Sequence, residues 1–80
     1  MSIEVRLHGT LAATRPGLRA GDPFPVELSG DATVADLVAA LTLAPEDAHL
    51  VIVNGRILHD RAAVLAEGDR VGLFPPTGGG

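Results

Sequence analysis

The N-terminal residues alternate between apolar and polar side chains, with apolar residues at positions 3, 5 and 7. Strand side chains point alternately to opposite faces, so this period of two predicts a half-buried strand. The alternation returns at Phe24, Val26 and Leu28 and predicts a second strand, antiparallel to the first. Residues 9–23 between them contain glycine and proline and predict a long connection. A helical turn is expected there at residues 11–14, and it must end before Pro16.

A helix is predicted to follow residues 31–33. Thr33 is a favourable N-cap, and Asp36 stands at the third helical position, where its carboxylate completes a capping box. Apolar residues then recur at the spacing of one helix face, at Val34, Leu37, Val38 and Leu41. Pro45 excludes residue 44 from helical geometry, so the helix should end by residue 43.

The second half of the chain predicts three more strands. A continuous apolar run at residues 50–53 precedes Asn54 and Gly55, which both accept the positive φ of a tight hairpin turn. A short return strand is expected at residues 56–58. A last strand is expected at residues 70–74, with Val71 and Leu73 facing the core. This order predicts an α+β fold in which one helix lies across a mixed, grasp-like sheet. The crossover through the helix makes the first and last strands candidates for parallel neighbours.

The residues that follow position 74 have a different composition. Pro75 and Pro76 lack a backbone N–H and hold φ at about −65°, so they end the last strand and favour an extended segment. Thr77 and three glycines come next. Fully extended, the six residues after Phe74 reach about 20 Å. We therefore divide the chain into a folded domain at residues 1–74 and an extended tail at residues 75–80.

The glycines of the tail suit a carboxylate on which chemistry is done. Gly79 and Gly80 have no Cβ, so they can enter a narrow channel and leave both faces of the terminal carbonyl open to attack. A carboxylate resists nucleophiles until it is activated, for example as an acyl-adenylate, after which a thiocarboxylate or an amide can form. The chain contains no nucleophile–base pair, phosphate loop or metal cluster, so it would be the substrate of these steps. A Gly-rich terminus without function is the alternative interpretation.

Composition narrows the class of partner and the compartment. Ten acidic against six basic residues give a net charge of −4, which disfavours nucleic acid and anionic membranes as partners. The absence of cysteine excludes disulfides and cysteine-based metal sites. The three histidines are not spaced as metal ligands and are interpreted as ordinary surface residues. No signal peptide or membrane-spanning run is recognisable, so we expect a cytoplasmic protein.

Five segments occur in a fixed order along the chain: I-E-V-R-L, D-A-T-V-A-D-L-V-A-A-L, V-I-V-N-G-R, L-A-E-G-D-R-V-G-L-F-P-P and the final G-G. In order and spacing they resemble the ubiquitin-like sulfur carriers, the family of the molybdopterin synthase small subunit and the thiamin sulfur carrier. The resemblance implies a β-grasp fold. It also implies that Gly80 is adenylated by a ubiquitin-activating-like adenylyltransferase that uses ATP. The resulting thiocarboxylate would pass its sulfur to an acceptor enzyme.

The resemblance further implies roles for the residues near the C-terminus. Gly78, Gly79 and Gly80 would thread the partners' active sites. Phe74, Pro75 and Pro76 would sit at the mouth of the partner's channel. The acceptor would be the molybdopterin synthase large subunit or an analogue, since the F-P-P ending slightly favours that branch over the thiamin branch. The chain itself would bind no cofactor. Thr77 and the long connection at residues 9–23 depart from the family pattern and leave the particular pathway open.

A partner surface is expected on the sheet. If Ile52 points toward the helix, Val51 and Val53 point to the opposite face, where Phe74 could join them. Such an open apolar face is typical of a protein interface, unless the long connection covers it. Two other functions stay open at this stage. One is a ubiquitin-like modifier linked through Gly80 to lysines of target proteins, and the other is a plain β-grasp interaction domain.

Overall fold

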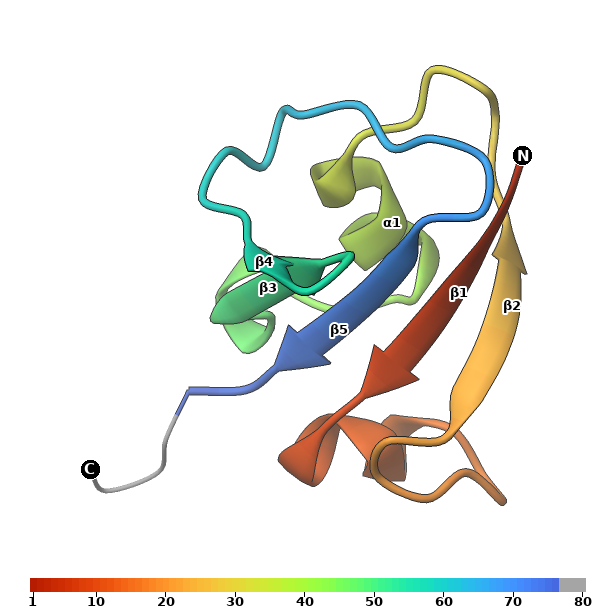
Figure 1. The fold of residues 1–80 in the computed structure, drawn as a ribbon. Coiled ribbons are helices and arrows are strands. Elements are labelled where there is room, and N and C mark those ends of the chain that lie inside the picture. The colour runs from red at the N-terminus through yellow and green to blue at the C-terminus, as the bar shows by residue number, and fades with distance from the viewer. Residues whose placement is uncertain (77–80) are drawn as a thin grey trace.

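The computed structural model describes residues 1–76. Its elements are β1 (Ser2–Leu7), β2 (Pro23–Glu27), α1 (Val34–Ala40), β3 (Leu50–Val53), β4 (Arg56–Ile57) and β5 (Arg70–Phe74), with 3-10 helices at Gly9–Thr14 and Pro45–Asp47. The strands form one mixed sheet in the order β2-β1-β5-β3-β4, and α1 packs across one face of it (Figure 1). The predicted α+β arrangement is confirmed.

The first and last strands are parallel neighbours at the centre of the sheet, as predicted. β1 pairs with β5 in a register that places Leu7 opposite Leu73, and it pairs antiparallel with β2 on its other side. β3 pairs antiparallel with β5 and, across the hairpin, with β4. Asn54 and Gly55 in that hairpin have φ values of 52° and 84°, as the turn signal requires. Because β1 and β5 run in the same direction, both end at one edge of the sheet.

Helix α1 begins where the sequence predicts. The Asp36 N–H donates to Thr33 Oγ1 at 3.2 Å, and the Thr33 N–H donates to Asp36 Oδ2 at 2.9 Å, so the capping box is complete. These reciprocal bonds satisfy two backbone donors that the first turn would otherwise leave unpaired. A helix as short as α1 depends on such caps and on tertiary packing.

The C-terminal end of α1 is closed by a second local motif. The Thr42 N–H donates to the Ala39 carbonyl at 2.9 Å, and the Leu43 N–H donates to the Val38 carbonyl at 3.1 Å. This pair of bonds is the Schellman motif, which normally places glycine in the left-handed conformation. Thr42 occupies that position here, with φ of 61°.

The core lies between α1 and the sheet. Side chains with almost no exposed surface come from α1 and from three strands, namely Ile3, Val5, Leu7, Val34, Leu37, Val51, Val71 and Leu73. The long connection contributes to the same core. Its 3-10 helix, where a helical turn is predicted, buries Leu11 and Ala12. The folded part is therefore held together on the α1 face of the sheet.

Candidate functional site: the open sheet face and the start of the tail

The tail starts at the end of the central strand β5. The His8 N–H donates to the Leu73 carbonyl at 3.0 Å and carries the pairing of β1 with β5 one step beyond β1. Pro75 and Pro76 follow outside the strand, because they have no N–H with which to continue the ladder. Pro75 is half-buried and Pro76 is exposed. Figure 1 shows the chain leaving the sheet at this edge.

The three glycines that sequence analysis assigns to the partners' active sites are Gly78, Gly79 and Gly80. They lie outside the residues that the structure describes, so their role stays a prediction. The described part of the predicted site consists of Phe74, the two prolines and the sheet residues beside them.

A group of apolar side chains lies on the sheet face opposite α1. Residues paired directly across neighbouring strands point to the same face. The pairings Leu50–Phe74, Ile52–Gly72 and Ile52–Ile57 therefore place four large side chains together. Ile57 is 55% exposed, and Leu50, Ile52 and Phe74 are partly exposed. We call Leu50, Ile52, Ile57 and Phe74 the open-face patch. Exposed apolar groups of this kind mark protein interfaces.

The predicted partner residues Val51 and Val53 lie on the other face, so that part of the prediction is wrong. Val51 is fully buried in the core, and Val53 packs against the core. The run at residues 50–53 is apolar throughout, so it can face either way. The register decides between the two, because Val51 pairs with the buried Leu73. Ile52 takes their place on the open face, and Phe74 is there as predicted.

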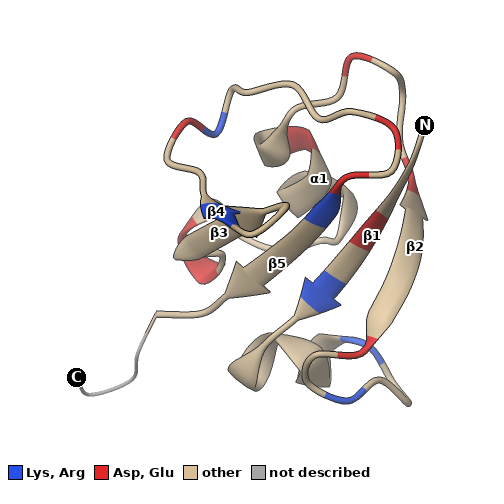
Figure 2. Ribbon diagram, in the orientation of Figure 1, with Lys and Arg blue, Asp and Glu red and all other residues tan. Residues whose placement is uncertain are grey.

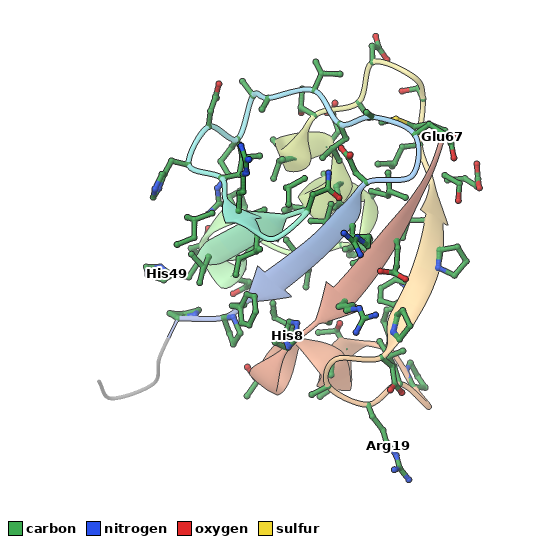
Figure 3. The ribbon with its side chains drawn as sticks, viewed as in Figure 1. His8, Arg19, His49 and Glu67 are labelled. Atoms are coloured by element: carbon green, nitrogen blue, oxygen red, sulfur yellow. The ribbon has the colours of Figure 1, made fainter. Side chains whose placement is uncertain are left out.

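His8 belongs to this surface, although its sequence context indicates only an ordinary surface histidine. Its ring stacks on Phe74, with the ring centroids 4.1 Å apart and the planes inclined by 3°. Figure 3 shows His8 beside the point where the chain leaves the sheet. The alternation of β1, carried one residue further, already places position 8 on the open face. The contact with Phe74 depended on the parallel pairing and could not be predicted from the alternation alone.

Gly72 creates a hollow at the centre of the open face. A Cβ at this position would lie 3.4 Å from Phe74 Cε1 and 3.6 Å from His8 Nε2. The hollow has a volume of about 170 Å³ and is also bordered by charged residues, namely Glu4, Arg6 and Arg70. The hollow therefore lies between the apolar patch and these charges.

The charges beside the patch come from β1 and β5. Arg6 Nε lies 3.6 Å from Glu4 Oε2. This carboxylate oxygen is buried and accepts no hydrogen bond from the part of the chain that the structure describes. Figure 2 shows basic segments on both strands next to an acidic segment on β1. The open face thus combines apolar contact area with polar groups at its border, as protein interfaces commonly do.

Residues 1–76 lack two other kinds of functional feature. No cluster of three or more His, Cys, Asp or Glu side chains that could hold a metal ion occurs in that range. Within it, no helix has the length and apolar character needed to cross a membrane. The candidate site in the described residues therefore consists of the open-face patch, the adjacent charged residues and the start of the tail at Pro75.

Solved structures with the same topology define the class of protein. SAMP1, the small archaeal modifier protein 1 of Haloferax volcanii, is 31% identical, with a TM-score of 0.69 and complete coverage (100%) of both chains. The putative molybdopterin converting factor subunit 1 of Pyrococcus furiosus is 26% identical, with a TM-score of 0.68 over 96% of this chain and 99% of that one. A complex of subunits 1 and 2 of the molybdopterin-converting factor of Helicobacter pylori contains a chain with 21% identity, a TM-score of 0.62 and 100% coverage of both chains, which shows the fold alone. The protein has the ubiquitin-like β-grasp fold.

The family follows from the sequence itself. The family model described as the ThiS family matches residues 19–80, which is most of the chain. The chain belongs to the ThiS family, and the resemblance that its motifs indicate is thereby confirmed. A search of curated protein sequences finds no significant match.

Proposed function

We propose that this chain is a sulfur carrier whose Gly80 carboxylate is adenylated with ATP and converted to a thiocarboxylate. The observation that carries the proposal is the ThiS family match over residues 19–80, a range that includes the open-face patch and the terminal glycines. The position of the tail supports it. Phe74 belongs to the patch and Pro75 follows it directly, so an enzyme that covers the patch meets the start of the tail in the same encounter.

The proposed chemistry takes place at one carbonyl carbon. A carboxylate oxygen of Gly80 attacks the α-phosphorus of ATP, pyrophosphate leaves, and an acyl-adenylate forms. A sulfur nucleophile at the oxidation state of hydrosulfide then attacks the carbonyl carbon. AMP leaves, and a thiocarboxylate remains. Glycine suits both steps because it leaves each face of the carbonyl free. The chain provides the acyl group, and the enzymes that act on it provide the catalytic residues.

Two partners follow from this chemistry. The first is a ubiquitin-activating-like adenylyltransferase, which binds the ATP. The second is a sulfur acceptor of the molybdopterin synthase large subunit type, or an analogue. The similarity to the Pyrococcus furiosus protein, named as subunit 1 of a putative molybdopterin converting factor, supports the second choice. In this proposal the chain holds no cofactor of its own, works in the cytoplasm and offers the open-face patch to each partner in turn.

A ubiquitin-like modifier is the second candidate, and the full-length similarity to SAMP1 favours it. Its first step is the same adenylation of Gly80. The two functions differ in the nucleophile that displaces AMP, which is sulfur for the carrier and a lysine amine of a target protein for the modifier.

Mass spectrometry of protein isolated from its host separates these functions. Replacement of one terminal oxygen by sulfur supports the carrier, whereas a Gly-Gly remnant on lysines of other proteins supports the modifier. If neither form appears, even in the presence of the host's activating enzyme and ATP, the proposal fails. The plain β-grasp interaction domain is then the better description.

A further inference from the structure

The residues that follow β1 lie beside the residues that follow β5. The two strands are parallel, and Leu7 is opposite Leu73 at their ends. The next residues therefore come side by side. The His8 ring stacks on Phe74 at a centroid distance of 4.1 Å, and the following residue, Gly9, is next to Pro75.

Gly9 permits an approach to Pro75 that a side chain would block. A Cβ built on Gly9 would lie 2.9 Å from Pro75 Cγ and 3.3 Å from Pro75 Cδ. Carbon atoms in contact are normally about 3.5–4.0 Å apart, so the proline ring would have to move. The ring is joined to the backbone at both Cα and N and fixes φ at that residue. Moving the ring away from Gly9 therefore also turns the chain that follows it.

Space is available for such a movement. A hollow of about 560 Å³ adjoins Pro75 and Pro76 and is bordered by Thr10, His49 and Leu50. Figure 3 shows His8 and His49 near the point where the chain leaves the sheet. The contact with Gly9 therefore limits the position of Pro75, although the neighbouring hollow would allow the ring to move.

We propose that Gly9 is a positioning residue that sets the direction in which the tail leaves the domain. The inference rests on the proposed function, because direction matters when Gly80 must reach a distant active site while the open-face patch is bound. Gly80 is joined to the sheet through Pro75, five residues before it, so a rotation at Pro75 changes the direction in which the chain starts toward that active site. Misplacement of a reacting group by about 1 Å can lower a rate by about a hundredfold.

Gly9→Ala and Gly17→Ala form a matched pair of variants. Both glycines have positive φ, 56° and 82°, so alanine is strained at either position. A Cβ at Gly17, however, meets nothing within 4 Å. We expect Gly17→Ala to lower the Tm by about 4–8 °C and Gly9→Ala to lower it by at least as much, because the proline ring must also move. Only Gly9→Ala should lower kcat for adenylation by the activating enzyme, by about tenfold or more. The KM for the carrier should stay within about twofold, because the open-face patch is unchanged.

Pro75→Ala supplies the rescue. It removes Cγ and Cδ, the two ring atoms that a Cβ at position 9 would strike. In a Pro75→Ala background, Gly9→Ala should therefore leave kcat unchanged relative to Pro75→Ala alone, as a double-mutant cycle measures. Equal kcat for Gly9→Ala and Gly17→Ala, a loss confined to KM, or no recovery in the double variant would each overturn the positioning role.

A nuclear Overhauser cross-peak between the Gly9 α-protons and the Pro75 ring protons tests the contact without any enzyme. We expect it in the free, unaltered protein, and its absence overturns the inference. If the cross-peak is present but the unaltered protein is not adenylated, the proposed function fails. The positioning role then falls with it, while the contact itself is established as a structural feature.

Discussion

Ile57 and Val64 are the large hydrophobic side chains that the described part of the chain leaves exposed, at 55% and 62%. They differ in the surface to which they belong. Ile57 is paired with Ile52 on the open face. Val64 lies outside the sheet, in an isolated bridge with Thr33 at the start of α1. Ile57 therefore belongs to the open-face patch, whereas Val64 is a single exposed apolar side chain outside it.

We predict that Ile57→Glu raises the KM of the activating enzyme for this protein by about tenfold, which corresponds to about 1.4 kcal/mol of lost binding. The free energy of unfolding should change by less than about 0.5 kcal/mol, because the position is exposed. Pyrophosphate exchange at varied carrier concentration measures the first quantity and urea denaturation the second.

Val64→Glu is the control and should leave the KM unchanged. Equal effects of the two substitutions would contradict the assignment of the open face as the partner surface.

The sheet face to which Ile52 points could not be predicted from the residues of β3 alone. In β5 the polar and small residues at positions 70 and 72 fix the inward side as Val71 and Leu73, and the structure agrees. The β3 run has no polar residue that would show which of its alternate side chains face the core. Its facing was decided by its pairing with β5, a contact between residues about twenty positions apart in the sequence. Patterning thus predicted the face of β5 and could not predict that of β3.

Among the elements, those closed by local interactions could be predicted most closely. The capping box of α1 and the Asn54–Gly55 turn each depend on residues at most three positions apart, and both occur as predicted. The C-terminal end of α1 was located only to within a few residues, because the sequence signal was the helix-breaking Pro45. The motif that ends the helix uses Thr42, a residue type that this position rarely accepts.

Thr42→Gly should stabilise the protein by about 0.5–1 kcal/mol. Threonine is β-branched and strained at a φ of 61°, whereas glycine adopts this conformation freely, which outweighs its larger entropy in the unfolded chain. Urea denaturation should show a higher midpoint with an unchanged slope.

Thr10→Gly provides the comparison, since Thr10 has no positive φ. Glycine there should destabilise by about 0.5–1 kcal/mol. A loss of stability in both variants would argue against strain at Thr42.

In the molecule as a whole, stability and the proposed function depend on different parts. The buried core lies between α1 and one face of the sheet, while the open-face patch lies on the other and the tail leaves from the edge. The order of the elements was enough to predict this architecture, because a single crossover helix can pack on only one face of a small sheet. The residues that lie on the opposite face could be assigned only once the register was known.

This separation leads to a prediction about two variants with opposite effects. Deleting Gly80 shortens the tail by about 3.5 Å, so the terminal carboxylate no longer reaches the position at which it is adenylated. We expect adenylation to fall by about a hundredfold or more, with the urea midpoint unchanged. Leu37→Ala should do the reverse. Leu37 is 0% exposed in the core. The cavity left by its truncation should lower the free energy of unfolding by about 2–5 kcal/mol. The molecules that remain folded should be adenylated by the activating enzyme with the original kcat. A marked loss of stability on deletion of Gly80 would mean that the tail packs on the domain. It would contradict the conclusion that stability depends on the core and the proposed function on the tail.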